Sequence, residues 1–352
     1  MLAVMRDHIH GEFTTFIKVW ILALMSLSYC YFAAKILPRG GARLSAFLPV
    51  AGFFLLAPLQ LQSIFLLLNL SFLLSWLATF RLFMLAFDNG PLSDPSLSLP
   101  KFLAVACLPI KLKSQEGDTR HCEKRPKSLS NYAVKVVVLA MVVVTCRYYA
   151  DHRRMYPEVV LNMYGLCIYL SLEIILAAVA AAATRSMAGM EMEPQFDEPY
   201  LSTSMQDFWG RRWNLTVSRI FHSAVYVPMR DLSAAVIGRR WAAQPAVMVT
   251  FAVSGLMHEL TFFHFGCAMP TREVTWFFLL HGASVAIEIA VKKEVKFVRG
   301  WRLTRVAGVV LTHGFMLATS LRFMHPQFLW CKEHRTFSAG KRLQVLLMNY
   351  IS

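Results

Sequence analysis

Charged residues are scarce in this chain, and acidic residues are the scarcer kind. Only 16% of the 352 residues are Asp, Glu, Lys or Arg, whereas 56% are hydrophobic. This composition is too apolar for an ordinary soluble domain. Lys and Arg outnumber Asp and Glu by 36 to 21. No compact, basic and aromatic-interleaved segment carries this excess, so we expect no nucleic-acid partner. The cations are better explained as loops that face anionic lipid and anionic ligands.

Several catalytic and metal-binding motifs are also missing. The seven cysteines are scattered and form no C-x-x-C pair, which argues against a disulfide framework and a zinc site. A zincin helix needs His-Glu-x-x-His, but the position of its second histidine is occupied here by Phe262. Neither G-x-S-x-G nor G-x-x-x-x-G-K-[ST] occurs, which disfavours a serine hydrolase and a P-loop ATPase. We therefore expect no bound metal.

Long apolar runs take the place of these motifs. A run of about 18 residues or more can cross a hydrocarbon core of about 30 Å. The candidate spans are residues 13–37, 44–59, 64–87, 132–149, 159–183, 245–265, 274–291 and 303–323. The expected fold class is all-α, a polytopic transmembrane bundle of about eight or nine broken and tilted spans around a central reaction chamber. We expect residues 1–352 to form a single membrane-embedded domain.

Polar and helix-breaking residues punctuate these runs. Pro49 should kink or shorten the second span, and the third should end at 88–91, where the sequence reads Asp-Asn-Gly-Pro. Arg81, in the last turns of the third span, should extend to the membrane interface. The polar and basic stretch 114–130 is predicted to be a mobile loop.

The distribution of Lys and Arg predicts an orientation in the membrane. The cytosolic loops should be those with the basic residues of 35–43, 111–135, 211–240 and 292–305. The amino terminus would then be lumenal. Arg153, Arg154 and the basic tail at 332–342 run against this assignment.

Two short blocks interrupt the apolar pattern. The first, SMQDFWGRRWN at 204–214, is polar, basic and rich in Trp. The second, VSGLMHE at 253–259, places His258 and Glu259 inside an apolar run. An ionisable pair at membrane depth is costly, which makes it a candidate functional site. We interpret the rest of the chain as a scaffold that brings the two blocks together.

His258 is the candidate general base. Helical spacing puts Ser254 and Phe262 on its face, and Gly255 leaves room for another backbone or a substrate. A neutral imidazole in an apolar chamber can take a proton from an alcohol while the hydroxyl attacks a carbonyl. The alternative, a core histidine bonded to a neighbouring carbonyl, has equal weight on sequence grounds.

The first block contains residue types suited to a phosphate-rich ligand. Its polar residues alternate with aromatic ones. The polar residues are Asp207, Arg211, Arg212 and Asn214, and the aromatic residues are Phe208, Trp209 and Trp213. Trp is also a common anchor at membrane interfaces, and Arg also satisfies lipid phosphate. Arg is nevertheless well suited to bidentate phosphate binding, and the Asn214 amide can donate to a carbonyl oxygen. These groups and a buried base suit acyl transfer from a phosphate-rich carrier.

The two blocks resemble the membrane-bound O-acyltransferase family, in particular its plant wax synthase branch. The LPIK stretch at 108–111 is also similar to that branch. The resemblance covers the whole chain in length and span pattern, but its specific motifs lie in the two blocks. In that family an asparagine of the Trp-Asn block and an intramembrane histidine form the active site, and the matching positions are Asn214 and His258. The FFHF stretch at 262–265 departs from relatives that have tyrosines there, which bears on acceptor preference.

The resemblance implies an enzyme of the endoplasmic reticulum membrane that uses acyl-CoA as co-substrate and no further cofactor. Acyl-CoA would enter from the cytosol and a lipophilic alcohol from the membrane. We expect fatty acyl transfer to a long-chain alcohol, giving a wax ester, with sterol or diacylglycerol as alternative acceptors. His258 and Asn214 are the expected catalytic residues. The expected substrate contacts are Asp207, Trp209, Arg211, Arg212, Trp213, Ser254 and Glu259.

Four further polar residues lie within predicted spans: Glu173, His281, Glu288 and His313. We expect them to pair structurally inside the bundle, although His281 and Glu288 share a face and can support the site. The rival function is a proton-coupled lipid transporter, in which His258, Glu259 and Glu288 would form a proton relay. Inverted repeats would favour a transporter, and none is evident in the sequence.

Overall fold

The computed structural model describes residues 2–112, 129–152, 157–186, 190–192, 195–265, 272–295 and 304–324. The chain divides into two compact units. The first comprises Met1–Leu108 and Glu198–Ser352, and the second comprises Pro109–Asp197. Most of the predicted loop at 114–130, Arg153 and Arg154, and the basic tail lie outside the described residues.

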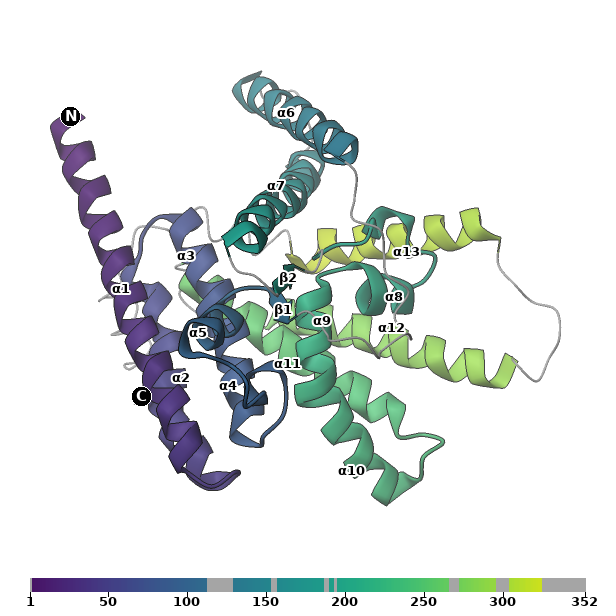
Figure 1. Cartoon of the computed structure of the whole chain (residues 1–352). Coiled ribbons are helices and arrows are strands. Elements are labelled where there is room, and N and C mark those ends of the chain that lie inside the picture. The colour runs from purple at the N-terminus through teal and green to yellow at the C-terminus, as the bar shows by residue number, and fades with distance from the viewer. Residues whose placement is uncertain are drawn as a thin grey trace, which may run out of the picture. The chain divides into compact units, whose positions relative to one another are not determined.

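The first unit is built from helices (Figure 1). Its amino-terminal part contains α1 (Leu2–Ile36), α2 (Gly41–Leu56), η1 (Ala57–Gln60), α3 (Ile64–Leu70), η2 (Ser71–Ala78), α4 (Thr79–Ala86), η3 (Pro91–Ser93) and α5 (Leu99–Cys107). Its carboxyl-terminal part contains η4 (Pro199–Leu201), α8 (Met205–Asp207), η5 (Phe208–Arg212), α9 (Leu215–Phe221), η6 (His222–Tyr226), α10 (Val227–Ile237), α11 (Ala243–His264), α12 (Glu273–Val295), α13 (Arg305–Thr319) and η7 (Ser320–Met324).

Seven helical stretches within the described residues are long and apolar enough to cross a membrane. They are His10–Ile36, Gly41–Gln60, Leu66–Ala86, Ser130–Tyr148, Ala243–His264, Glu273–Glu294 and Arg305–Met324. The remaining predicted span, 159–183, falls in α7, where the apolar stretch Asn162–Ala178 is shorter. The structure confirms the predicted all-α, multi-span fold class. The single embedded domain stays a prediction.

Local sequence signals end the helices near the predicted positions. Pro49 lies within α2, which ends at Leu56 and passes into the 3-10 turn η1. α4 ends at Ala86, and Asp88 and Gly90 then adopt positive φ angles of 58° and 81°. Glycine adopts a positive φ angle at little energetic cost, which explains why residue 90 in this turn is a glycine.

Arg81 does not extend to the membrane interface, so that prediction was wrong. Its side chain is buried, and its guanidinium donates hydrogen bonds to the carbonyls of Val105 and Leu108. These carbonyls lie at the carboxyl end of α5, where backbone acceptors lack partners within their own helix. A buried cation is tolerated here because it satisfies those acceptors, and Arg81 therefore ties α4 to α5.

Small residues allow α11 and α12 to pack closely. A Cβ atom at Gly255 would lie 3.0 Å from the Thr275 Cα atom, and one at Gly282 would lie 2.8 Å from the Phe251 Cβ atom. These distances leave no room for a larger side chain without movement of one helix. The helix that carries His258 is thus held directly against α12.

Four of the described segments in the first unit are π-helical: η2, η5, η6 and η7. Such wide turns are frequent at functional sites. η2 and η6 contribute Trp76 and Ala224 to one buried cluster, and η5 and η7 contribute Trp209 and Phe323 to another. Both clusters include residues of α11, so the wide turns gather around the helix that carries His258.

The second unit is a helical hairpin with a short β-ladder. It contains β1 (Ile110–Leu112), α6 (Leu129–His152), α7 (Pro157–Ser186) and β2 (Met190–Met192). β1 and β2 pair antiparallel, with Lys111 opposite Glu191. Lys135 on α6 and Glu173 on α7 form a buried ion pair. The expected structural pairing of Glu173 is therefore confirmed.

Candidate active site

His258 lies on α11 with one ring nitrogen bonded and the other without a partner. Its Nδ1 atom is 2.8 Å from the carbonyl oxygen of Ser254, one turn earlier. A carbonyl can only accept, so Nδ1 carries the proton and donates it. The Nε2 atom is then the unprotonated nitrogen, and no described residue is hydrogen-bonded to it. His258 therefore presents a basic nitrogen in a fixed tautomer.

The other three histidines of the last three spans use both ring nitrogens. His264 is bonded to Ser71 and to the Leu55 carbonyl. His281 is bonded to Trp209 and Thr319, and His313 lies within hydrogen-bond distance of the Val309 and Pro199 carbonyls. This contrast separates the structural histidines from His258, and it confirms the expected structural pairing of His281 and His313.

Aromatic rings enclose His258. The ring of Phe278 stacks on it with centroids 4.2 Å apart and planes inclined by 29°. The Trp76 ring meets it edge to face, with centroids 4.7 Å apart. The Trp76 indole N–H donates to the Thr261 hydroxyl at 3.2 Å, which fixes the orientation of the indole. Rings on two sides restrict rotation of the imidazole and shield it from water.

Asn214 occupies the N-cap of α9 in a left-handed conformation, with φ of 40° and ψ of 65°. Asn tolerates this region better than most residues. Its side-chain oxygen accepts from the Val217 backbone N–H at 3.4 Å. The side-chain NH₂ group makes no hydrogen bond to the described residues, so it can donate to a ligand.

The helices of Asn214 and His258 border one hydrophobic cluster. Val217 and Phe221 of α9 and Met257 of α11 share one hydrophobic cluster with Trp76. No hydrogen bond between the described atoms joins Asn214 directly to His258. Asn214 and His258 thus lie on helices that contact the same cluster, and each side chain has a polar group without a hydrogen bond to the described residues.

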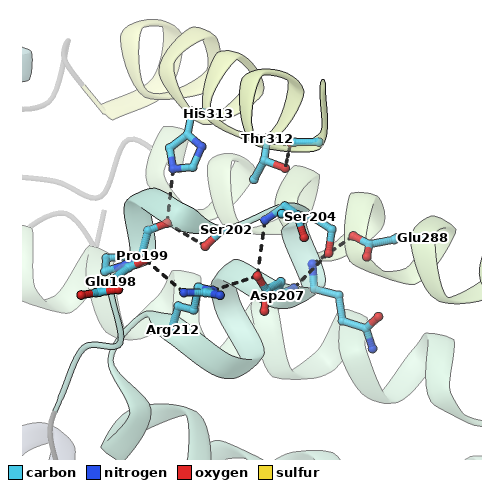
Figure 2. A network of polar contacts seen from close by, with 12 residues as sticks. Glu198, Pro199, Ser202, Ser204, Asp207, Arg212, Glu288, Thr312 and His313 are labelled. Atoms are coloured by element: carbon cyan, nitrogen blue, oxygen red, sulfur yellow. Dashed lines mark hydrogen bonds and ion pairs between the residues drawn. The ribbon is translucent and has the colours of Figure 1, made fainter. Parts of the chain in front are cut away.

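A network of polar contacts fixes the first block (Figure 2). Arg212 donates to the Asp207 carboxylate at 2.8 Å and to the Glu198 carbonyl at 3.3 Å. Asp207 also accepts from the Thr203 backbone N–H, and the Ser204 hydroxyl caps α8 by accepting from the Asp207 backbone N–H. Asp207 and Arg212, both predicted as substrate contacts, therefore brace the segment that leads to Asn214.

Arg211 differs from Arg212. It is exposed and lines a pocket of about 530 Å³ together with Asp207, Arg212, Lys292, Thr304 and Arg305. Lys292 is paired with Glu288, whereas Arg211 and Arg305 have no ion-pair partner among the described residues. Four cationic side chains and one carboxylate line this pocket, which suits an anionic ligand.

The remaining residues that were predicted to contact substrate make contacts within the protein. The Glu259 carboxylate accepts from the Thr275 backbone N–H and hydroxyl at 3.1 and 3.3 Å, in the first turn of α12. Ser254 contacts His258 through its backbone carbonyl. Trp213 stacks on Phe208, and the Trp209 indole donates to His281.

His281 and Glu288 connect α12 to the first block. Glu288 accepts from the Gln206 backbone N–H at 3.0 Å, and His281 accepts from Trp209 at 3.2 Å. This observation confirms that their shared face carries interhelical links. The sequence analysis missed Trp76 and Phe278, because nothing in an apolar run shows which aromatic ring will meet the histidine.

Known proteins resemble this chain over most of its length. The family model described as membrane bound O-acyl transferase family matches residues 192–280, which include both blocks. The chain is 42% identical to acyl-CoA–sterol O-acyltransferase 1 of Arabidopsis thaliana, over 90% of this chain and 91% of that protein. It is 41% identical to a long-chain-alcohol O-fatty-acyltransferase of Simmondsia chinensis, over 91% of each chain.

A third relative, probable long-chain-alcohol O-fatty-acyltransferase 3 of Arabidopsis thaliana, is 41% identical over 90% of each chain. Identity at this level over nearly the full length is decisive for family membership, and the helical spans and the two blocks agree with it. The chain is a multi-pass membrane protein and an acyltransferase that belongs to the membrane-bound O-acyltransferase family.

Proposed function

We propose that this enzyme transfers a fatty acyl group from acyl-CoA to the hydroxyl of a long-chain alcohol, giving a wax ester. The free Nε2 atom of His258 is the observation that carries this proposal. A base in an apolar enclosure can activate a lipophilic alcohol without competition from bulk water.

The proposed reaction gives each free polar group one role. His258 Nε2 takes the hydroxyl proton as the alcohol oxygen forms a bond to the thioester carbonyl carbon. The carbonyl oxygen gains negative charge, and the NH₂ group of Asn214 donates a hydrogen bond to it. The intermediate then collapses by breaking the carbon–sulfur bond. The CoA sulfur leaves with the electron pair and recovers the proton from His258.

The basic pocket supports binding of the carrier. CoA carries several phosphate charges, and Arg211 and Arg305 are cations without ion-pair partners in the described structure. Arg212 and Lys292 are already paired and add positive potential rather than free donors. We assign the CoA phosphates to this pocket, on the cytosolic side that the basic loops predict.

The acceptor assignment draws on the relatives. Two of the three relatives named above are called long-chain-alcohol acyltransferases, and one is called a sterol acyltransferase at nearly the same identity. Sterol is therefore the second candidate acceptor. The endoplasmic reticulum membrane is the proposed location.

The rival proton relay is less well supported by the contacts. Glu259 is bonded to Thr275, and Glu288 to Gln206 and Lys292. Neither carboxylate is hydrogen-bonded to His258 in the described structure. A relay requires continuous proton-transfer contacts, which these pairings do not provide.

An acceptor competition tests the proposal. Purified protein in detergent is given acyl-CoA with hexadecanol, a sterol and diacylglycerol together, and free CoA thiol and each ester are measured. We expect wax ester as the main product and a loss of about 100- to 10,000-fold in His258→Ala. His222→Ala, at an exposed histidine on η6, is the matched control and should retain activity.

Sterol ester as the main product would move the assignment to the second acceptor. Thiol release without any ester would contradict acyl transfer to an alcohol. Near wild-type turnover by folded His258→Ala would exclude His258 as the base.

A further inference from the structure

A chain of hydrogen bonds runs from the first block across α12 to α13. The Trp209 indole nitrogen lies 3.2 Å from Nδ1 of His281, and Nε2 of His281 lies 2.8 Å from the Thr319 hydroxyl. The Thr319 hydroxyl lies 2.8 Å from the Phe315 carbonyl. Three side chains from η5, α12 and α13 are thereby connected.

The chemistry of the groups gives this chain one direction. An indole N–H can only donate, so Nδ1 of His281 accepts and must be unprotonated. Nε2 then carries the proton and donates to the Thr319 oxygen, whose own hydrogen goes to the Phe315 carbonyl. A neutral imidazole satisfies every partner, whereas a doubly protonated ring would lose the bond from Trp209.

His281 is fully buried and packed among aromatic rings. The Phe277 and Phe315 centroids lie 4.0 and 5.2 Å from its own. Placing a polar ring there is costly unless both nitrogens are bonded, and a phenylalanine would fill the space without that cost. Interhelical linkage alone is one explanation, and the next contacts along the chain provide a functional one.

Trp209 connects His281 to the base. Its ring centroid lies 5.6 Å from that of Phe278 and 5.7 Å from that of Phe251. Phe278 in turn stacks on the imidazole of His258 at 4.2 Å. Because α11 and α12 touch at Gly255, where an added Cβ atom would lie 3.4 Å from the Phe278 Cβ atom, Phe278 has little room to move away.

We propose that His281 is a positioning residue, which holds the Trp209 indole by its hydrogen bond and, through Trp209 and Phe278, keeps the His258 imidazole in its reactive orientation. The inference rests on the proposed role of His258 as base. It assigns His281 no contact with either substrate, so its loss should affect turnover rather than carrier binding.

The test uses the full-length enzyme with kcat and KM measured per mole of folded protein. His281→Phe keeps an aromatic ring, slightly larger than the imidazole, and removes both hydrogen bonds. We expect kcat to fall about 10- to 100-fold with an unchanged KM for acyl-CoA, because small displacements of a catalytic group have effects of this order. His281→Asn offers an oxygen to Trp209 and should recover most of the loss. Wild-type kcat in folded His281→Phe would overturn the proposal.

A double variant of Trp209 and His281 distinguishes a positioning role of His281 from a general effect on protein stability. Trp209→Phe removes the donor, and the double variant with His281→Phe should be no slower than the slower single variant. His264→Phe is the matched control, since His264 is also fully buried and bonds at both nitrogens, to Ser71 and to the Leu55 carbonyl, on the side of η2 and α2. It should lower the melting temperature and leave kcat per folded enzyme unchanged. Independent losses in the double variant, or an equal loss of kcat in His264→Phe, would contradict a specific role.

Thr319→Val provides a milder variant should His281→Phe fail to fold. It removes the acceptor of the His281 Nε2 proton and loosens the imidazole that holds Trp209, so a reduced kcat supports the proposal and an unchanged kcat refutes it. The proposed function fails separately: in that case His258→Ala would remain active, whatever the His281 variants do.

Discussion

The His258 and Phe278 rings lie face to face, with their centroids 4.2 Å apart, and the phenyl ring is almost fully buried. This contact should fix the direction in which the free Nε2 atom points. We expect Phe278→Leu to lower kcat about tenfold or more while the KM for acyl-CoA is retained, because the imidazole gains rotational freedom. Phe102→Leu makes the same change in an equally buried residue on α5, outside the cluster of Phe278, and should leave kcat unchanged. Equal kcat values in the two variants would contradict this role.

Asn214 has both a backbone role and a proposed chemical role, and two substitutions separate them. Asn214→Asp keeps an oxygen for the Val217 N–H but lacks the NH₂ group, so kcat should fall about 100- to 1,000-fold, as for loss of one oxyanion donor. Asn214→Gly tolerates the left-handed backbone but lacks the cap and the amide, and it should lose kcat to a similar extent. The measurement is kcat per mole of folded protein, and the unfolding temperature of each variant checks that it is folded. A well-folded Asn214→Asp with wild-type kcat would show that the amide does not act on the reacting carbonyl.

The two adjacent arginines should respond differently to the same change. Arg211→Gln should raise the KM for acyl-CoA about tenfold and leave kcat unchanged, because loss of one charge-assisted hydrogen bond weakens binding by about that factor. The effect should shrink as ionic strength rises, because the side chain is exposed. Arg230→Gln, at an exposed arginine outside the pocket, is the control.

Arg212→Gln should instead reduce the yield of folded protein, since it breaks the contacts to Asp207 and the Glu198 carbonyl. Size-exclusion profiles in detergent would report this loss. A normal profile with only a raised KM would assign Arg212 to carrier binding and exclude the bracing role.

Two glycines on α13 form a matched pair for stability. A Cβ atom at Gly308 would lie 2.7 Å from the Thr203 carbonyl oxygen, whereas one at Gly314 would meet nothing within 4 Å. Gly308→Ala should therefore destabilise the protein by about 1–3 kcal/mol, the usual cost of overpacking. Gly314→Ala should be neutral or stabilising by up to about 1 kcal/mol through helix propensity. Thermal unfolding in detergent measures both, and equal melting temperatures would mean that α13 does not pack on Thr203 as described.

Features encoded within a few consecutive residues were predictable from the sequence. Apolar length located the spans, and the turn at Asp88 and Gly90 ended the third span. Each of these signals depends on neighbours in the chain. The basic and aromatic character of the first block was evident for the same reason. The catalytic pair Asn214 and His258, which the resemblance implies, stays a prediction.

Features that depend on distant partners were not predictable. Arg81 was expected at the membrane interface because its partners, the Val105 and Leu108 carbonyls, belong to another helix. His264 is bonded to Ser71, 193 residues away, and no local pattern encodes that pair. The ion pair of Asp207 likewise forms with Arg212 and not with Arg211, and two adjacent identical residues cannot show in the sequence which one will pair.

The π-helical segment η2 has a consequence for chain length. A π turn holds one residue more than an α turn, and one residue in an α-helix corresponds to a rotation of about 100°. The extra residue between Ser71 and Ala78 is absorbed locally, so Trp76 reaches His258 while Arg81 still faces α5. Deletion of one residue here can close the wide turn into a regular one without rotating the rest of the helix. A deletion of one residue should therefore be tolerated better within Ser71–Ala78 than in a regular part of the same span.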